Sequence, residues 1–179
     1  GLINALKVVN KKFSEVKVVF IGYGAANYEI FNLLVQYGLN PKNCIIFDSK
    51  GTLHKDRDDC KGTYKEKACL ITNGEDVRGD HAEALKGADV LIALSKPGPD
   101  TVKGEWIKGM NKDAIVFVCA NPIPEIWPWV AKEAGAKIVV TGRSDFPNQV
   151  NNSLGFPSIF RGALDVNAKT ITDGMCIRA

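Results

Sequence analysis

A buried strand that leads into a glycine turn and then into a helix limits this chain to few folds. Residues 17–21 (Lys-Val-Val-Phe-Ile) have the β-branched and aromatic composition of a buried strand. Gly22 and Gly24 follow, and apolar residues with helical spacing continue to Tyr37. This order aims the backbone N–H groups of the turn and the positive end of the helix at a phosphate. We therefore expect the two glycines to bind the pyrophosphate of a dinucleotide.

The next predicted strand, residues 44–48, ends in Asp48, where an acid can hold a ribose 2′-hydroxyl group. Together with the first strand and helix it makes a βαβ unit of the size that binds nicotinamide dinucleotides. Asn27 occupies the place of the third glycine of the usual fingerprint. We expect Asn27 to widen the approach of helix to strand or to make a local polar contact. A strand, turn and helix without a ligand is the alternative, and Asp48 argues against it.

Strands and helices alternate along the rest of the chain. Further strands are expected at 88–94, 114–119 and 137–141, and a short apolar run at 68–71 is grouped with them. Helices are expected at 1–9, 81–86, 106–110 and 127–134. The strands are continuous apolar runs, which is typical of a parallel sheet covered on both faces. The pattern predicts an α/β fold with a doubly wound, mostly parallel, Rossmann-type sheet.

The composition is that of a soluble globular protein. Hydrophobic residues make up 45% and charged residues 24% of the 179 residues, which suits one domain with a substantial core. The net charge of +3 is too small and too dispersed to indicate a nucleic acid or a membrane surface as partner. No apolar run approaches the roughly 20 residues that span a bilayer. The lysines at 11–12 and 65–67 are expected to lie on solvated faces.

The cysteines and acids indicate neither a disulfide framework nor a metal site. Five cysteines are scattered, and none forms a Cys-x-x-Cys pair, so we expect a reducing, cytoplasmic compartment. The charged stretch 50–67 is expected to be an exposed loop or hairpin. Its acids lack the spacing of a calcium loop.

The residues at both ends lead us to expect that the chain is a piece of a longer protein. There is no initiating methionine, the chain opens inside a predicted helix, and it closes just after a helix start at Thr172. We expect residues 1–179 to be a single domain of a longer enzyme.

Polar residues follow the predicted strands at the edge where a doubly wound sheet binds its ligand. The segments at these strand ends are 22–27, 48–50, 95–99, 120–124 and the residues from 141 onward. Asn121 precedes Pro122, and its amide can donate to a carboxylate and accept from a carboxamide. It either positions nicotinamide or an acid substrate, or it only forms an Asn-Pro turn. The polar segment 141–157 is either functional or a helix-capping segment.

No catalytic acid or base is evident. The only histidines are His54, in the charged stretch, and His81, which follows Asp80 and is expected to be a helix N-terminal residue. Neither is expected at the strand ends, and no Ser-His-Asp or Cys-His arrangement is convincing. The chain therefore has the features of a cofactor site without the remainder of an active site.

Several segments resemble the NAD(P)-binding domain of small, bacterial and archaeal type malic enzymes. They are Cys-Ala-Asn-Pro-Ile-Pro-Glu-Ile at 119–126, Glu-Ala-Gly-Ala at 133–136, the polar stretch 141–152, 156–165, Asp-Ser-Lys-Gly at 48–51 and the opening residues 1–9. The resemblance covers essentially the whole chain, and 141–165 is its most specific part.

The resemblance implies oxidation and decarboxylation of L-malate to pyruvate and carbon dioxide, with NAD or NADP and a divalent Mg²⁺ or Mn²⁺ ion. The catalytic Tyr and Lys of that family and its acidic metal ligands lie upstream of the segment that this chain matches. The resemblance therefore implies no catalytic residue and no metal ligand in this chain, an upstream catalytic domain, a homodimer, and an inactive chain on its own.

Site residues are carried over by motif. The resemblance implies that Gly22, Gly24, Ala25 and Ala26 hold the pyrophosphate, with Asn27 beside them, and that Asp48 meets the adenosine ribose. It implies that Ser95 lines the nicotinamide side, that Asn121 contacts nicotinamide and substrate, and that Asn152 reaches the malate carboxylate.

The sequence leaves alternatives open for the cofactor and for the wider function of the chain. Asp48 favours NAD, because a 2′-phosphate would face a carboxylate, but Lys50, Lys55, Arg57 and Lys65 are near enough in sequence to offset that charge. A stand-alone dinucleotide-binding module without catalysis, or the cofactor domain of another dehydrogenase, would share the same glycine turn.

Overall fold

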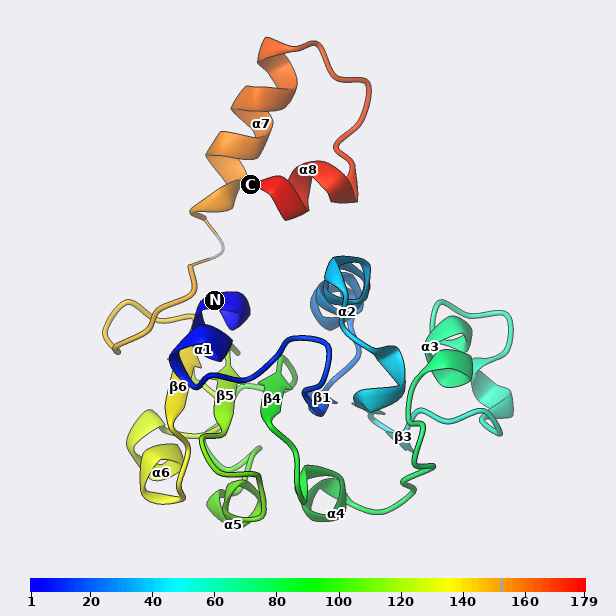
Figure 1. The fold of residues 1–179 in the computed structure, drawn as a ribbon, viewed down its shortest axis with the longest axis vertical. Coiled ribbons are helices and arrows are strands. Elements are labelled where there is room, and N and C mark those ends of the chain that lie inside the picture. The colour runs from blue at the N-terminus through cyan, green and yellow to red at the C-terminus, as the bar shows by residue number, and fades with distance from the viewer. Residues whose placement is uncertain (152) are drawn as a thin grey trace.

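The computed structural model describes residues 1–151 and 153–179. Its centre is a six-stranded sheet with the order β3-β2-β1-β4-β5-β6 (Figure 1). The strands are β1 Val18–Ile21, β2 Cys44–Asp48, β3 Gly51–Thr52, β4 Val90–Ala93, β5 Ile115–Val118 and β6 Ile138–Thr141. All neighbours pair in parallel except β3, which runs antiparallel to β2. The predicted Rossmann-type sheet is confirmed.

Helices cover both faces of the sheet. On one face lie α1 Leu2–Val8, α2 Ala25–Tyr37 and α3 Glu66–Ile71, and on the other lie α4 His81–Leu85, α5 Gly104–Lys108 and α6 Pro128–Glu133 (Figure 1). Two short 3₁₀ turns, Pro41–Asn43 and Asp58–Cys60, complete this body. No described helix is long and apolar enough to cross a membrane.

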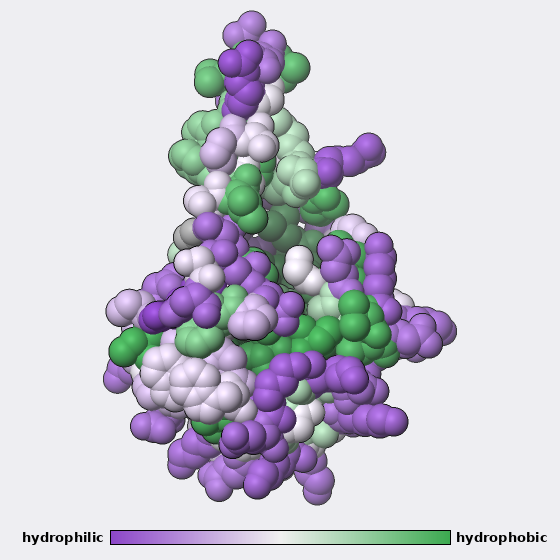
Figure 2. All heavy atoms as spheres, turned by 90° about the vertical axis from the view of Figure 1, so that its left-hand side faces the viewer, coloured by the Kyte–Doolittle hydropathy of each residue, from purple (hydrophilic) through white to green (hydrophobic). Residues whose placement is uncertain are grey.

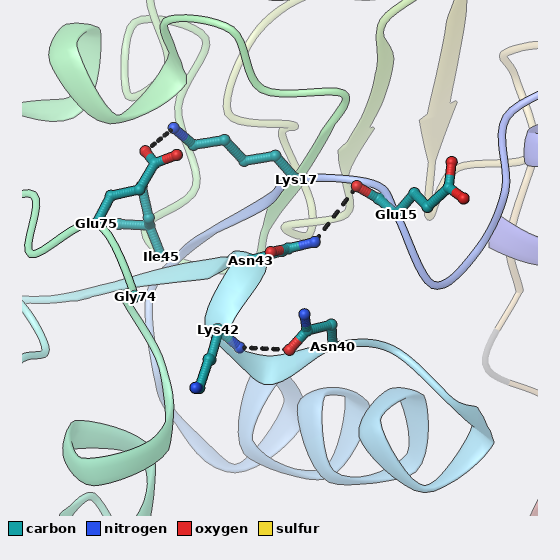
Figure 3. A pocket seen from close by; sticks show the side chains of 8 residues that line it. All are labelled: Glu15, Lys17, Asn40, Lys42, Asn43, Ile45, Gly74 and Glu75. Carbon is teal, nitrogen blue, oxygen red and sulfur yellow. Dashed lines mark hydrogen bonds and ion pairs between the residues drawn. The ribbon is translucent and has the colours of Figure 1, made fainter.

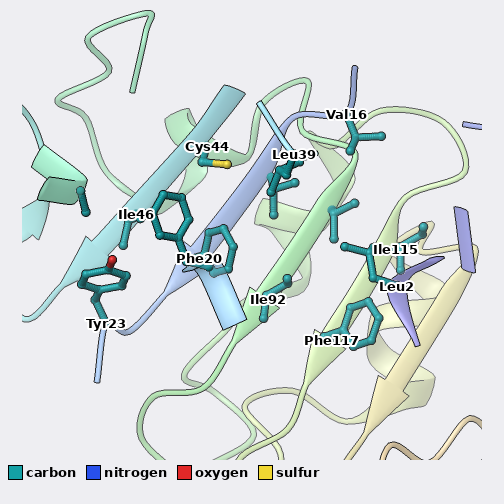
Figure 4. Packing of buried hydrophobic residues seen from close by; sticks show 14 of the residues in the cluster. Leu2, Val16, Phe20, Tyr23, Leu39, Cys44, Ile46, Ile92, Ile115 and Phe117 are labelled. Atoms are coloured by element: carbon teal, nitrogen blue, oxygen red, sulfur yellow. The ribbon is translucent and has the colours of Figure 1, made fainter. Parts of the chain in front are cut away.

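Two hydrophobic layers sandwich the sheet. Every residue of β1 is buried, and alternate residues point to opposite faces. Phe20 packs edge-on against Phe31 of α2, with 5.8 Å between ring centroids, and Figure 4 shows Phe20 among Ile46 and Ile92 of the neighbouring strands. Val19 faces the opposite layer. Burial on both faces explains why the strands are continuous apolar runs.

The last two helices project from this body. Helix α7, Gly155–Asp165, has no buried residue. Helix α8, Asp173–Arg178, follows the N-cap residue Thr172, whose side chain accepts a hydrogen bond from Met175 N–H. Helix α8 contacts α2. Seen from the β6 side, the two helices form a protrusion with hydrophobic residues on its surface (Figure 2). Phe156, Phe160 and Leu164 are exposed there.

Three expectations from the sequence were wrong. The run 68–71 is part of α3, in which Ala68 and Cys69 are buried, Ile71 packs against the core and Leu70 is exposed; four apolar residues cannot distinguish a strand from a helix. Lys11 is not a solvated lysine, since its ammonium group lies 2.7 Å from Asp89. Lys65 likewise pairs with Asp48 at 2.6 Å.

Candidate functional site

A cavity of about 620 Å³ lies at the carboxyl ends of β1, β2 and β4. Chain connections leave β1 and β4 toward opposite sides of the sheet, and this is where doubly wound proteins bind ligands. The cavity is lined by the predicted residues Gly22, Gly24, Asp48 and Ser95, and also by Ser49, Tyr64, Lys65, His81 and Lys96. The structure thus brings four of the predicted site residues together.

Gly22 occupies a position in the turn where no other residue type fits without strain. Its φ angle is +89°, a left-handed conformation that favours glycine. A Cβ atom at this position would lie 2.6 Å from the carbonyl oxygen of Leu94. The turn after β1 therefore passes directly against the end of β4.

The N-terminus of α2 opens toward solvent. Gly24, Ala25 and Ala26 are exposed, and a Cβ atom at Gly24 would contact nothing within 4 Å. Within the described residues, no side chain accepts from the first N–H groups of this 13-residue helix. Free N–H groups and the helix dipole together favour an anion such as pyrophosphate.

Asn27 makes the local polar contact expected of it. The side chain is fully buried, and its amide nitrogen donates to the carbonyl oxygens of Gly22 at 2.7 Å and Ile21 at 3.3 Å. Its Oδ1 atom has no partner among the residues that the structure describes. Asn27 therefore ties the first turn of α2 to the glycine turn, in place of the close packing that a third glycine permits.

Asp48 lies in the cavity but is already engaged. Its carboxylate accepts hydrogen bonds from Arg57, from Lys65 and from the backbone N–H of Lys50. Burial alone would raise the pKa of Asp48, but the hydrogen bonds from Lys65 and Arg57 outweigh it and lower the pKa. The carboxylate stays ionised, and the expected contact with a ribose stays a prediction.

Glu125 is a buried acid that the sequence analysis did not single out. Its carboxylate accepts from the N–H of Ser95 at 3.0 Å and of Ala120 at 3.1 Å, so it joins the loops that follow β4 and β5. No ion pair to Glu125 is found within residues 1–151 and 153–179, and burial raises its pKa. The only sequence signal was its place in the Asn-Pro-Ile-Pro-Glu segment.

Asn121 lines a second cavity, of about 410 Å³, at the ends of β4 and β5. This cavity is mainly apolar, with Ala26 and Leu94 in its wall. Gly142 lets β6 end beside Asn121, because a Cβ there would lie 3.3 Å from the Asn121 side-chain nitrogen. Ala26 and Asn121 thus share one cavity, and Ser95 lines the neighbouring one. The predicted substrate residue Asn152 lies outside the described residues.

His81 lies closer to the site than expected. Its imidazole lines the first cavity and stacks between Phe47 and Trp106, with centroid distances of 4.3 and 4.9 Å. Burial lowers its pKa, which favours the neutral ring. The predicted place at a helix start is confirmed, with Asp80 as the N-cap residue. Its stacked position was not evident from the sequence.

Two negative observations limit the chemistry of the described residues. Within 1–151 and 153–179, no cluster of three or more His, Cys, Asp or Glu side chains could hold a metal ion. A separate hollow at the amino ends of β1 and β2 has polar groups that satisfy one another: Lys17 pairs with Glu75, and Asn43 donates to the Glu15 carbonyl oxygen (Figure 3). That hollow is not a candidate site.

Comparison with known proteins shows which proteins this chain is similar to as a whole. No protein-family model matches the chain. It is 44% identical to an NAD-dependent malic enzyme of Geobacillus stearothermophilus and 46% identical to an NADP-dependent malic enzyme of Rhizobium meliloti (strain 1021). Both matches cover 100% of this chain, but only 36% and 23% of those proteins.

The crystal structure of Entamoeba histolytica malic enzyme superimposes with a TM-score of 0.96 at 56% identity. That match covers 98% of this chain and 37% of the other. The chain therefore spans less than half the length of the malic enzymes that it matches.

Proposed function

We propose that this chain, which matches the dinucleotide-binding domain of malic enzymes in sequence and fold, binds a nicotinamide dinucleotide for the oxidation and decarboxylation of L-malate. The observation that carries the proposal is the glycine turn at the switch point of the sheet. At Gly22 the turn packs against the end of β4. The N–H groups at the N-terminus of α2, which no described side chain caps, face outward next to this turn. Such a turn holds a pyrophosphate across the crevice.

The residues present fit such a cofactor. The pyrophosphate would lie on Gly22, Gly24, Ala25 and Ala26, with the adenosine on the β2 side and the nicotinamide toward Ser95 and Asn121. The bound nicotinamide supplies a hydride acceptor. Asn121 would orient the carboxamide or the substrate carboxylate, because its amide both donates and accepts. Asn152 is proposed to reach the malate carboxylate.

The acid, base and metal ligands are proposed to lie outside this chain. The described residues offer no cluster that fits Mg²⁺ or Mn²⁺, and among them no imidazole or carboxylate lines the cavity of Asn121. We therefore propose that residues 1–179 act as one domain beside an upstream catalytic domain, that the complete enzyme is a cytoplasmic homodimer, and that the isolated chain does not turn over malate.

A fluorescence titration with NADH and NADPH tests the binding half of the proposal. We expect saturable binding of at least one of them by the isolated chain. A longer polypeptide that includes the upstream segment is then expected to oxidise malate in the presence of Mn²⁺. Binding without turnover in the longer polypeptide would favour a dinucleotide-binding module without catalysis, and absence of any binding would reject the proposal.

A further inference from the structure

The carboxylate of Asp48 has no acceptor capacity left for a ribose. Oδ1 accepts from Lys50 N–H at 2.8 Å and from Arg57 Nη1 at 3.3 Å, and Oδ2 accepts from Arg57 Nη2 at 3.1 Å and from Lys65 Nζ at 2.6 Å. Two carboxylate oxygens offer about four acceptor sites in all. The acid that would distinguish NAD by binding its 2′-hydroxyl is therefore occupied by the protein itself.

Arg57 is held as firmly as the acid it neutralises. Besides Asp48, its guanidinium donates to both oxygens of Asp59 and to the carbonyl oxygen of Thr52. Its side chain is only 11% exposed. Arg57 therefore acts as a fixed countercharge within the protein, with no donor free for a ligand.

Lys65 has donors to spare and faces the cavity. An ammonium group has three N–H donors, and only the one to Asp48 is used within the described residues. Lys65 lines the same cavity as Ser49 and Gly22. Lys50, paired with Asp59 at 2.9 Å, adds a third cation to a group that contains two carboxylates. The local charge next to the end of β2 is positive.

We propose that this cationic cluster, formed by Lys65 and Lys50 with Arg57 as the countercharge of Asp48, is a subsite for the 2′-phosphate of the dinucleotide. The chain then prefers NADP(H) over NAD(H), contrary to what Asp48 alone suggests. Lys65 donates directly to the phosphate, and Lys50 contributes through its charge. The inference rests on the proposed function, because it concerns the adenosine half of the same site.

Calorimetric titration of the chain with NADPH, NADH, 2′,5′-ADP and 5′-AMP tests the subsite. We expect NADPH and 2′,5′-ADP to bind at least about tenfold more tightly than their partners without the 2′-phosphate, because a charge-assisted hydrogen bond is involved. The advantage is expected to shrink between low and high salt. Equal or tighter binding of NADH and 5′-AMP would overturn the inference but keep the proposed function, whereas binding of none of the four would reject both.

The matched variants are Lys65→Met and Lys61→Met. Lys61 is also a lysine of this loop, but it is exposed and paired only with exposed Asp58. We expect K65M to lose most of the preference for NADPH without any loss of NADH affinity, and K61M to behave as the parent chain. A K65M variant that keeps the full preference, or that loses affinity for both dinucleotides equally, would contradict the role of Lys65. The salt dependence of the parent chain is a second measurement that needs no variant to fold.

Discussion

The two halves of the candidate site each contain a buried carboxylate, but the surroundings of the two acids differ. Asp48, on the proposed adenosine side, is paired with Arg57 and Lys65, and its pKa is lowered. Glu125, on the proposed nicotinamide side, accepts only from backbone N–H groups, and burial raises its pKa. The first half is organised by ion pairs between charged side chains, of which Lys65 keeps donors for a ligand. The second is organised by directional hydrogen bonds that hold two loops in place.

The largest effect is expected where the two halves meet, at Gly22. The substitution Gly22→Ala places a Cβ atom 2.6 Å from the Leu94 carbonyl oxygen at a φ angle of +89°, so we expect a loss of about 3 kcal/mol in unfolding free energy. Urea denaturation would measure the loss. Gly24→Ala is the matched control: nothing lies within 4 Å of its Cβ, so the fold is kept while cofactor binding weakens. A stable G22A chain would contradict the close approach of the turn to β4.

Replacement of Glu125 tests the nicotinamide half. The amide of Glu125→Gln has one acceptor oxygen for two backbone donors, so one buried N–H is left without a partner. We expect a loss of about 1 to 2 kcal/mol in unfolding free energy at pH 7. Affinity for the whole dinucleotide is expected to fall, while that for 5′-ADP, bound at the other half, stays the same. Equal losses for both ligands would mean that Glu125 stabilises the fold as a whole.

Removal of the countercharge tests the adenosine half. Arg57→Met frees acceptor sites on Asp48, and we expect selectivity to shift severalfold toward NADH, while Lys65 still pairs with the acid. The ratio of NADPH to NADH affinities measures this shift. An unchanged ratio would show that Asp48 does not face the ribose.

The smallest effect is a difference in pH dependence between the two acids. A lowered pKa in the folded state gives Asp48 a stabilising contribution that is lost as pH falls through that value, so the deficit of Asp48→Asn is expected to grow as pH rises from about 3 to 7. Ionisation of Glu125 costs stability above its unfolded pKa of about 4.3, so the deficit of Glu125→Gln is expected to shrink over the same range. Thermal denaturation across this range would show whether the two slopes have opposite signs.

The features that depend on local sequence could be predicted, and those that depend on distant partners could not. Gly22 and Gly24 and the limits of β2 follow from residue type and periodicity. The pairing of Asp48 with Lys65 requires the hairpin after β2 and the following 3₁₀ turn to fold back across 17 residues. Glu125 reaches Ser95 across 30 residues, through two loops whose conformations no periodicity describes. Residue types along the chain therefore indicated segments that lie at the cavity, such as Gly22 and Asp48, but not the partners of their side chains.

The exposed C-terminal helices have a thermodynamic consequence. Helix α7 has no buried residue and relies on local contacts, such as the Phe156–Phe160 ring pair and the Arg161–Asp165 ion pair. Helices of this length are marginal without tertiary packing. Because the large apolar side chains of α7 already lie in water, this helix contributes little to the heat-capacity increment of unfolding. The calorimetric transition of this chain is therefore that of the sheet and its two hydrophobic layers, while the amide hydrogens of α7 exchange with solvent through local openings that leave the cofactor cavity intact.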